Sequence, residues 1–311
     1  MKHYLYALGA ILCWASLPAA TGSGLSELST EELMFYSFST AAIFLYIQDI
    51  ILTKKMSVAF PGIKACLFGF SGLFFYHYIY YLALEKAPLA EGAILATTWS
   101  LWIVIFSSII LLRRLAPSIL GAALFGFAGA ALVIAAGKEL FFASTHLQGY
   151  LLALICGVIW SSFSVGLPLF KLKIEPMTGF TILTAIASGV VFLSTTPHEM
   201  PSGSAMLSAL YLGAIPLGFS FFLWNRAITG GNMVIIGFLS YLTPPLAILL
   251  VAIIHGQKIS YQVIFGMFVI ILASILGKVA LGKILKIDLQ ITKNRPRQSV
   301  KLKNIHNILM L

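Results

Sequence analysis

The stretch YLYALGAILCWAS at residues 4–16 recurs as YLLALICGVIWSS at residues 150–162, at a constant offset of 146 positions. Farther along the chain an offset of 144 gives five more matches: Gly69 with Gly213, Leu73 with Leu217, Phe75 with Phe219, Ala83 with Ala227 and Leu95 with Leu239. We interpret these matches as an internal duplication. One repeat is expected in residues 1–136 and the other in residues 149–285.

The repeats consist almost entirely of long apolar segments. Hydrophobic residues make up 59% of the 311 residues and charged residues only 10%, which excludes a water-soluble fold. A helix needs about 20 apolar residues to cross a bilayer. Ten runs of this length lie near residues 4–21, 33–53, 62–84, 89–112, 117–136, 149–169, 177–195, 205–225, 231–254 and 262–282. We therefore predict an all-α integral membrane protein with ten transmembrane helices.

Each repeat holds five predicted spans, and an odd number has a topological consequence. The second repeat must enter the membrane from the side opposite to the first, so the two repeats are inverted. Inverted repeats of this kind surround a central cavity near the bilayer midplane, and that cavity opens alternately to either side. This arrangement favours a carrier over a structural protein or a membrane enzyme.

Basic residues are divided unevenly between alternate loops. The loops on one side contain Lys2, Lys54, Lys55, Lys64, Arg113, Arg114, Lys171, Lys173 and Arg226. The other side carries mainly acidic residues, namely Glu27, Glu31, Glu32, Glu85, Glu139 and Glu199. Lys and Arg concentrate in cytoplasmic loops, so both termini are predicted to be cytoplasmic in the bacterial inner membrane. Asp49 and Arg226, at cytoplasmic span ends, are expected to reach the interface.

The net charge of +10 does not indicate a nucleic-acid-binding protein. Much of it lies in the C-terminal residues 286–311, which we interpret as a basic cytoplasmic tail that contacts anionic lipid or enforces the topology. The first apolar run resembles a signal peptide, but we expect it to be retained because its removal would destroy the first repeat. The three cysteines follow no metal or disulfide spacing.

The third span carries the polar and aromatic stretch Tyr76-His77-Tyr78-Ile79-Tyr80-Tyr81. Helical geometry places His77 with Tyr80 on one face, and Tyr76 with Tyr80 almost stacked. A polar imidazole inside a span is costly in lipid, which favours a cavity-facing role for His77 and Tyr80. The alternative is an interfacial belt, because Tyr also prefers the headgroup level.

Two tryptophans occupy equivalent places in the repeats, Trp14 in the first span and Trp160 in the sixth. Such rings stack on an aromatic ligand, and their indole N–H groups bind a carboxylate. Core packing is the competing interpretation. Trp99 in the fourth span and Tyr241 in the ninth are expected to line the same cavity. The segment Tyr241-Leu242-Thr243-Pro244-Pro245 should kink its span, because proline removes helix hydrogen bonds.

Glu91 is the carboxylate closest to the start of a cavity-type span. It could bind a substrate ammonium, exchange a proton, or cap its helix N-terminus. No Lys or Arg stands in the middle of a span, which argues against phosphorylated substrates. The chain also lacks a Walker motif and HExxH. We therefore predict no enzymatic activity, no catalytic or metal-ligating residue and no cofactor.

The sequence resembles EamA-type members of the drug/metabolite transporter superfamily. Three segments resemble YddG-type aromatic amino acid exporters in particular: Phe75-Tyr76-His77 with Tyr80, Ala83–Glu91 (ALEKAPLAE), and Trp99-Ser100-Leu101-Trp102-Ile103-Val104. The resemblance covers residues 4–285 and implies ten spans in two inverted repeats. It also implies that the cavity residues are Trp14, Tyr76, His77, Tyr80, Trp99 and Trp160.

We therefore expect a monomeric carrier that exports small zwitterions, above all aromatic or other neutral amino acids, by alternating access. The expected partners are a small-molecule substrate and the lipid bilayer. Two alternatives remain open at this stage. One is a carrier of a purine, a nucleoside or a cationic drug, which an aromatic cavity would also stack. The other is a membrane partner protein that transports nothing.

Overall fold

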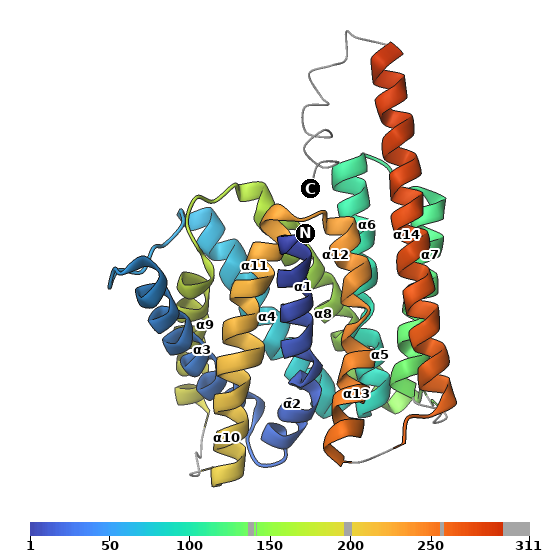
Figure 1. Cartoon of the computed structure of the whole chain (residues 1–311). Coiled ribbons are helices and arrows are strands. Elements are labelled where there is room, and N and C mark those ends of the chain that lie inside the picture. Colours follow the sequence, from blue (N-terminus) through green and yellow to red (C-terminus); the bar gives the residue numbers. More distant parts are fainter. Residues whose placement is uncertain (136–139, 141, 196–200, 256–257, 295–311) are drawn as a thin grey trace.

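The protein is a helical bundle, shown by a computed structural model that describes residues 1–135, 140, 142–195, 201–255 and 258–294 (Figure 1). The helices are α1 (Lys2–Ala15), α2 (Leu17–Leu25), α3 (Thr30–Thr53), α4 (Ile63–Lys86), α5 (Leu89–Ala96), α6 (Thr98–Leu112), α7 (Pro117–Ala135), α8 (Leu147–Gly166), α9 (Met177–Ser194), α10 (Gly203–Leu212), α11 (Ser220–Gly230), α12 (Met233–Ser240), α13 (Thr243–His255) and α14 (Tyr261–Asn294). Short 3₁₀ turns η1 (Ser144–His146) and η2 (Leu167–Phe170) flank α8, and a π-helix, η3 (Gly213–Phe219), joins α10 to α11. The described residues contain no strand.

Ten helical segments in the described part of the chain are long and apolar enough to cross a membrane. Each overlaps one of the ten predicted runs, so the prediction of an all-α membrane protein with ten spans is confirmed. Six of the ten are single α-helices or an α-helix with short 3₁₀ ends, and four contain a break or a π-helix. Those irregular spans are α1–α2, α5–α6, α10–η3–α11 and α12–α13.

The local sequence explains where helices begin and end. Ser29 caps α3, because its hydroxyl accepts a hydrogen bond from the Glu32 backbone while the Glu32 carboxylate accepts one from the Ser29 backbone. The helix ends at Thr53, and the next residue, Lys54, adopts a left-handed conformation. The break between α12 and α13 falls at Tyr241–Leu242, just before the two prolines, so the predicted kink is confirmed.

Helices pack mainly across the two halves of the chain. α1 packs against α11 and α4 against α8, while α3 pairs with α9, α6 with α12 and α7 with α14. The α7–α14 pair is especially close: a Cβ atom on Gly129 would lie 2.9 Å from the Gly266 carbonyl oxygen, and one on Gly266 would lie 2.8 Å from that of Gly129. Small residues allow this approach, as is usual between membrane helices.

The chain begins and α14 ends at the same end of the bundle (Figure 1). α14 continues to Asn294, so the first part of the predicted tail, which begins at residue 286, is helical. Residues 295–311 lie outside the described part of the chain.

Candidate binding pocket

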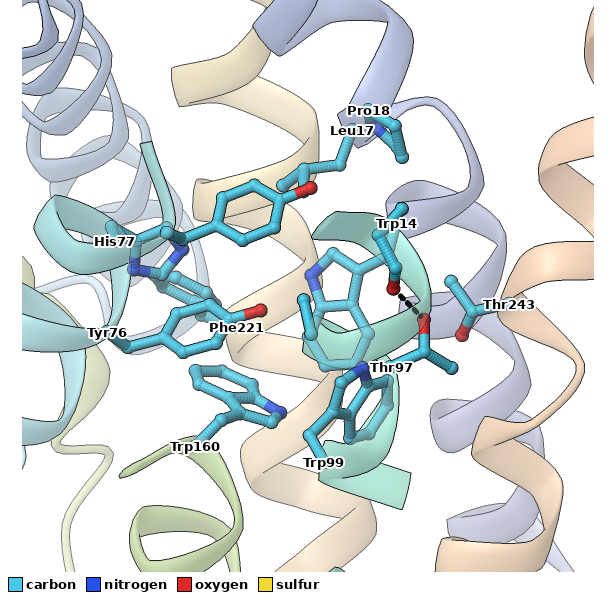
Figure 2. Close-up of a pocket in the computed structure, with 13 residues that line it drawn as sticks. Trp14, Leu17, Pro18, Tyr76, His77, Thr97, Trp99, Trp160, Phe221 and Thr243 are labelled. Carbon is cyan, nitrogen blue, oxygen red and sulfur yellow. Dashed lines mark hydrogen bonds between the residues drawn. The ribbon is translucent and has the colours of Figure 1, made fainter. Parts of the chain in front are cut away.

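A pocket of about 80 Å³ lies inside the bundle, where the irregular spans meet α4 and α8 (Figure 2). It is lined by Trp14, Leu17, Pro18, Tyr76, His77, Tyr80, Ala93, Ala96, Thr97, Trp99, Trp160, Phe221 and Thr243. No Lys, Arg, Asp or Glu is among these described lining residues. The surface is therefore aromatic and uncharged.

Four tryptophans form a connected cluster at the pocket. The Trp14 ring lies 5.4 Å from that of Trp160 and 5.8 Å from that of Trp99, both edge to face. Trp224 of α11 joins this cluster, with its ring 4.9 Å from that of Trp14. Aromatic pairs in such geometry contribute about 0.5–1.5 kcal/mol each beyond their buried area. Trp14 and Trp160, predicted from the repeat to meet, are in contact.

The indole N–H groups of these rings differ in availability. Trp14 Nε1 donates to the Pro216 carbonyl oxygen at 2.9 Å, and Trp224 Nε1 donates to Ser164 Oγ at 3.0 Å. The expectation that the Trp14 N–H binds a ligand is therefore wrong for this conformation. Among the described residues, the N–H groups of Trp99 and Trp160 have no recorded hydrogen-bond partner, and both rings line the pocket.

His77 is 2% exposed and lies at the pocket wall. Its Nδ1 is 2.9 Å from the Leu73 carbonyl oxygen, so Nδ1 must carry the proton and donate it. In the neutral ring the other nitrogen, Nε2, is then a hydrogen-bond acceptor. The imidazole also packs edge to face against Phe38, Phe221 and Trp160. His77 thus offers the pocket a lone pair inside an aromatic cage.

Two tyrosines extend this wall along α4. The rings of Tyr76 and Tyr80 are stacked at 5.9 Å with an interplanar angle of 11°, as helical spacing predicts. Tyr76 also lies 4.9 Å from Trp160. Figure 2 shows Tyr76 and His77 on one side of the tryptophans and Thr97 and Thr243 on the other.

Helix breaks supply the remaining side of the pocket. Leu17 follows the α1–α2 break, Thr97 stands at the α5–α6 break and Thr243 follows the α12–α13 break. The hydroxyl of Thr97 donates to the Ala93 carbonyl oxygen at 2.8 Å and that of Thr243 to Ser240 at 2.9 Å. Interrupted spans are tolerated in membranes where they line a cavity, and this pocket fits that rule.

Two predicted site residues do not reach the pocket. Glu91 is buried in the first turn of α5, two residues before the lining residue Ala93 and therefore on a different face. The Tyr241 hydroxyl donates to the Ala123 carbonyl oxygen at 2.8 Å, and its ring packs against Gly126. Tyr241 thus fixes the α12–α13 break to α7.

The sequence analysis missed Phe221, Trp224 and Thr243. The offset of 144 residues could have found them, because it pairs His77 with Phe221, Tyr80 with Trp224 and Trp99 with Thr243. The two halves therefore contribute residues from equivalent positions. The first half supplies the more polar member of the pair at His77.

Comparisons with known proteins agree with this architecture. The profile of the EamA-like transporter family matches residues 1–135 and 147–277. The aromatic amino acid exporter YddG of Ancylobacter novellus is 33% identical over 246 residues, covering 78% of this chain and 85% of the relative. An uncharacterized transporter of Archaeoglobus fulgidus is 26% identical over 257 residues, with the same coverage of 78% and 85%. A solved crystal structure superposes with a TM-score of 0.81 at 30% identity, covering 90% of this chain and 97% of the other.

Proposed function

This chain belongs to the EamA-like transporter family, and from that membership and the pocket we propose that it exports aromatic and other neutral amino acids across the bacterial inner membrane by alternating access. The observation that carries the proposal is the uncharged cage of Trp14, Trp99, Trp160 and His77. The likeness to an aromatic amino acid exporter supports the same substrate class.

The pocket chemistry suits both ends of an amino acid and its ring. The apolar part stacks on the tryptophans. The ammonium group donates to Nε2 of His77, and the carboxylate accepts from the N–H groups of Trp99 and Trp160. These groups interact with each charge through dipoles rather than through full countercharges. Binding is therefore modest, which suits a carrier that has to release its substrate.

The size of the pocket implies that the rings move during transport. Pockets that enclose small organic ligands typically measure about 300–1,000 Å³, well above the volume of about 80 Å³ found here. An aromatic amino acid therefore enters only when some of the rings separate. The breaks at Ser16, Thr97 and Tyr241–Leu242 lie beside these rings and provide places where the spans bend.

The helix pairs support an inverted repeat. If spans 1–5 correspond to spans 6–10, then the contact of span 1 with span 8 (α1 with α11) must correspond to that of span 6 with span 3 (α8 with α4). Both contacts are present. Spans 2 and 7, 4 and 9, and 5 and 10 pair with their own equivalents, and a two-fold axis maps each of these pairs onto itself. The family profile also matches in two segments of similar length.

The orientation rests on charge, with both termini in the cytoplasm. The cations that carry this argument lie at the end of the bundle where the chain begins. Lys2 starts α1, Lys54 and Lys55 follow α3, Lys171 follows η2, and the Arg226 carbonyl oxygen lies 2.8 Å from His3 Nδ1. The aromatic walls of the pocket would also stack a purine or a flat cation, so substrate identity has to be tested against those classes.

Counterflow into proteoliposomes tests the proposal with a panel of amino acids, nucleosides and cationic dyes. We expect uptake of phenylalanine, tyrosine and tryptophan, with competition among them, and no dependence on ATP. If nucleosides or dyes are taken up and amino acids are not, the proposed substrate class is wrong and the transported class takes its place. Absence of any flux, with folded protein in the vesicles, would reject the carrier function.

A further inference from the structure

Two larger cavities lie at opposite ends of the bundle, in equivalent places of the two repeats. The first, of about 550 Å³, lies at the end where the chain begins, and we call it the basic mouth. Its polar and charged lining residues are Lys171, Lys173, Glu175, Asn225, Arg226 and Thr229. The second, of about 540 Å³, is the acidic mouth, with Glu31 and Glu85. The offsets of 146 and 144 pair Ser29 with Glu175 and Leu82 with Arg226, each residue lining its mouth.

The two mouths carry opposite charges. Three cations and one carboxylate line the basic mouth, whereas two carboxylates and no described cation line the acidic one. The acidic groups already have partners, because Tyr78 donates to Glu31 at 3.1 Å and Thr30 to Glu85 at 3.4 Å. Each of these two carboxylates thus already accepts a hydrogen bond from a neighbouring side chain.

Two side-chain atoms of the basic mouth are buried without a hydrogen-bond partner, Nε of Arg226 and Oδ1 of Asn225. Asn225 is 6% exposed, and its Nδ2 donates to Glu175 Oε1 at 2.7 Å, which fixes the amide with Oδ1 free. The Arg226 guanidinium is held over the Phe222 ring at 4.1 Å. Buried polar atoms without partners are costly. One donor and one acceptor on adjacent residues thus lack a partner in this conformation, and a small movement of either side chain would turn them toward the mouth.

α11 connects this mouth to the central pocket within little more than one turn. Phe221 lines the pocket, Asn225 lines the mouth, and fully buried Trp224 lies between them. Trp224 is hydrogen-bonded to Ser164 of α8, and we call this pair the inner seal. α8 and η2 repeat the order, with Trp160 at the pocket and Leu167 at the mouth. A solute in the mouth is separated from the pocket by the inner seal.

We propose that the basic mouth is a second substrate site, which binds the amino acid before the inner seal opens. Arg226, supported by Lys171, binds the substrate carboxylate, and Asn225 Oδ1 accepts a hydrogen bond from the ammonium group. This inference rests on the proposed function for the identity of the zwitterion. A phospholipid headgroup that carries both phosphate and ammonium offers the same chemistry, so the test has to separate the two sources.

Protection of a single cysteine measures occupancy of the mouth directly. Thr229 is exposed at the mouth, so Thr229→Cys is introduced after Cys13, Cys66 and Cys156 are replaced by alanine. The rate of modification by a methanethiosulfonate reagent is measured in lipid-free maltoside micelles, with phenylalanine or phenylalanine amide. We expect phenylalanine to slow the reaction and the amide, which lacks the carboxylate, to have little effect.

In Arg226→Gln, the phenylalanine concentration that half-protects the cysteine should rise about tenfold, because one charge-assisted hydrogen bond is lost. Lys171→Gln should raise it less, and provides a second variant if Arg226→Gln does not fold. Lys55→Gln is the matched control, because Lys55 is an exposed cation at the same end but outside the mouth. It should leave protection unchanged.

A Trp160→Ala background separates the mouth from the central pocket. If phenylalanine still protects the cysteine in this background, the mouth is an independent site. If the protection disappears, the cysteine reports a movement caused by binding in the central pocket, and the proposal is overturned. Equal protection by phenylalanine and its amide would also overturn it, as would protection by added phosphatidylethanolamine but not by phenylalanine. If counterflow is absent in the wild type, the proposed function fails; if counterflow is present and the cysteine is never protected, the entrance site alone fails.

Discussion

The indole N–H of Trp14 donates a hydrogen bond to the carbonyl oxygen of Pro216, with 2.9 Å between the two atoms. This bond joins the first span to the π-helix η3 of the eighth span. The Ser220 hydroxyl donates to the same oxygen. Trp14 therefore both lines the pocket and ties the two halves together. Its repeat equivalent Trp160 makes no such bond to another described residue.

The two tryptophans should therefore respond differently to Trp→Phe substitution. Trp14→Phe removes a buried hydrogen bond and should lower the free energy of unfolding by about 1 kcal/mol. Trp160→Phe removes a similar ring area from a buried site but breaks no hydrogen bond, so it should lower the free energy of unfolding less than Trp14→Phe does, and it should reduce affinity for amino acids that carry a free carboxylate. Thermal unfolding in detergent and counterflow measure the two effects. Equal stability losses at both positions would contradict the assignment.

His77→Phe should separate packing from hydrogen bonding, because phenylalanine is the residue at the equivalent position, Phe221. The aromatic contacts remain while the acceptor Nε2 is lost. We expect normal amounts of folded protein and a loss of phenylalanine affinity of about 2 kcal/mol, roughly thirtyfold. An analogue without the ammonium group should bind the wild-type protein and His77→Phe with the same affinity. Unchanged phenylalanine affinity would make His77 a packing residue.

Cysteine labelling should determine the orientation in the membrane. Ser26 lies in the exposed loop between α2 and α3, and Lys55 is exposed at the opposite end. We expect an impermeant maleimide added to intact cells to label Ser26→Cys but not Lys55→Cys. Permeabilised cells provide the control, in which both positions should react. The reverse pattern in intact cells would place the termini outside.

The stability of the protein should depend on the protonation of Glu175. Burial raises the pKa of this carboxyl from 4.5 to about 7, despite the opposing charge of Arg226 and the hydrogen bond from Asn225. The folded protein holds the proton to a higher pH than the unfolded chain does. The stabilising contribution of this group is therefore complete below about pH 4.5 and is lost as the pH rises through 7.

We accordingly expect the unfolding temperature to fall between about pH 5 and pH 8, and Glu175→Gln to reduce that fall. Exposed Glu27 provides the matched control, since Glu27→Gln removes a carboxylate from the other end of the bundle. A wild-type slope in Glu175→Gln would show that other groups are responsible.

Much of the fold follows from hydropathy and length, because a segment that crosses the bilayer must be long, apolar and helical. A break within a span can be predicted from the sequence where a proline follows it, as Pro244 follows the break between α12 and α13. The break at Thr97 has no proline beside it. Membrane helices are apolar on most faces, so periodicity does not show which side faces a cavity. For this reason the sequence predicts Glu91 and Tyr241 at the pocket from their position along the span alone, although neither lines it.

Pocket residues were predictable where chemistry or the repeat singled them out. His77 and Tyr80 stand out as polar groups inside a span, and Trp14 and Trp160 match at the offset of 146. The inner seal, by contrast, depends on the orientation of α11 relative to α8. The contact between Trp224 and Ser164 joins residues 60 positions apart, and no local pattern indicates it.

The pairing of helices across the two halves also constrains how the protein is made. The partners of α1, α3, α4 and α7 are α11, α9, α8 and α14, all of which leave the ribosome later. The first five spans therefore enter the bilayer with their contact surfaces covered only by lipid. The glycine surface of α7 at Gly129 stays uncovered until Gly266, near the end of the chain, is inserted. A chain whose synthesis stops between these two glycines therefore keeps the small-residue surface of α7 in contact with lipid, without the helix that covers it in the finished protein.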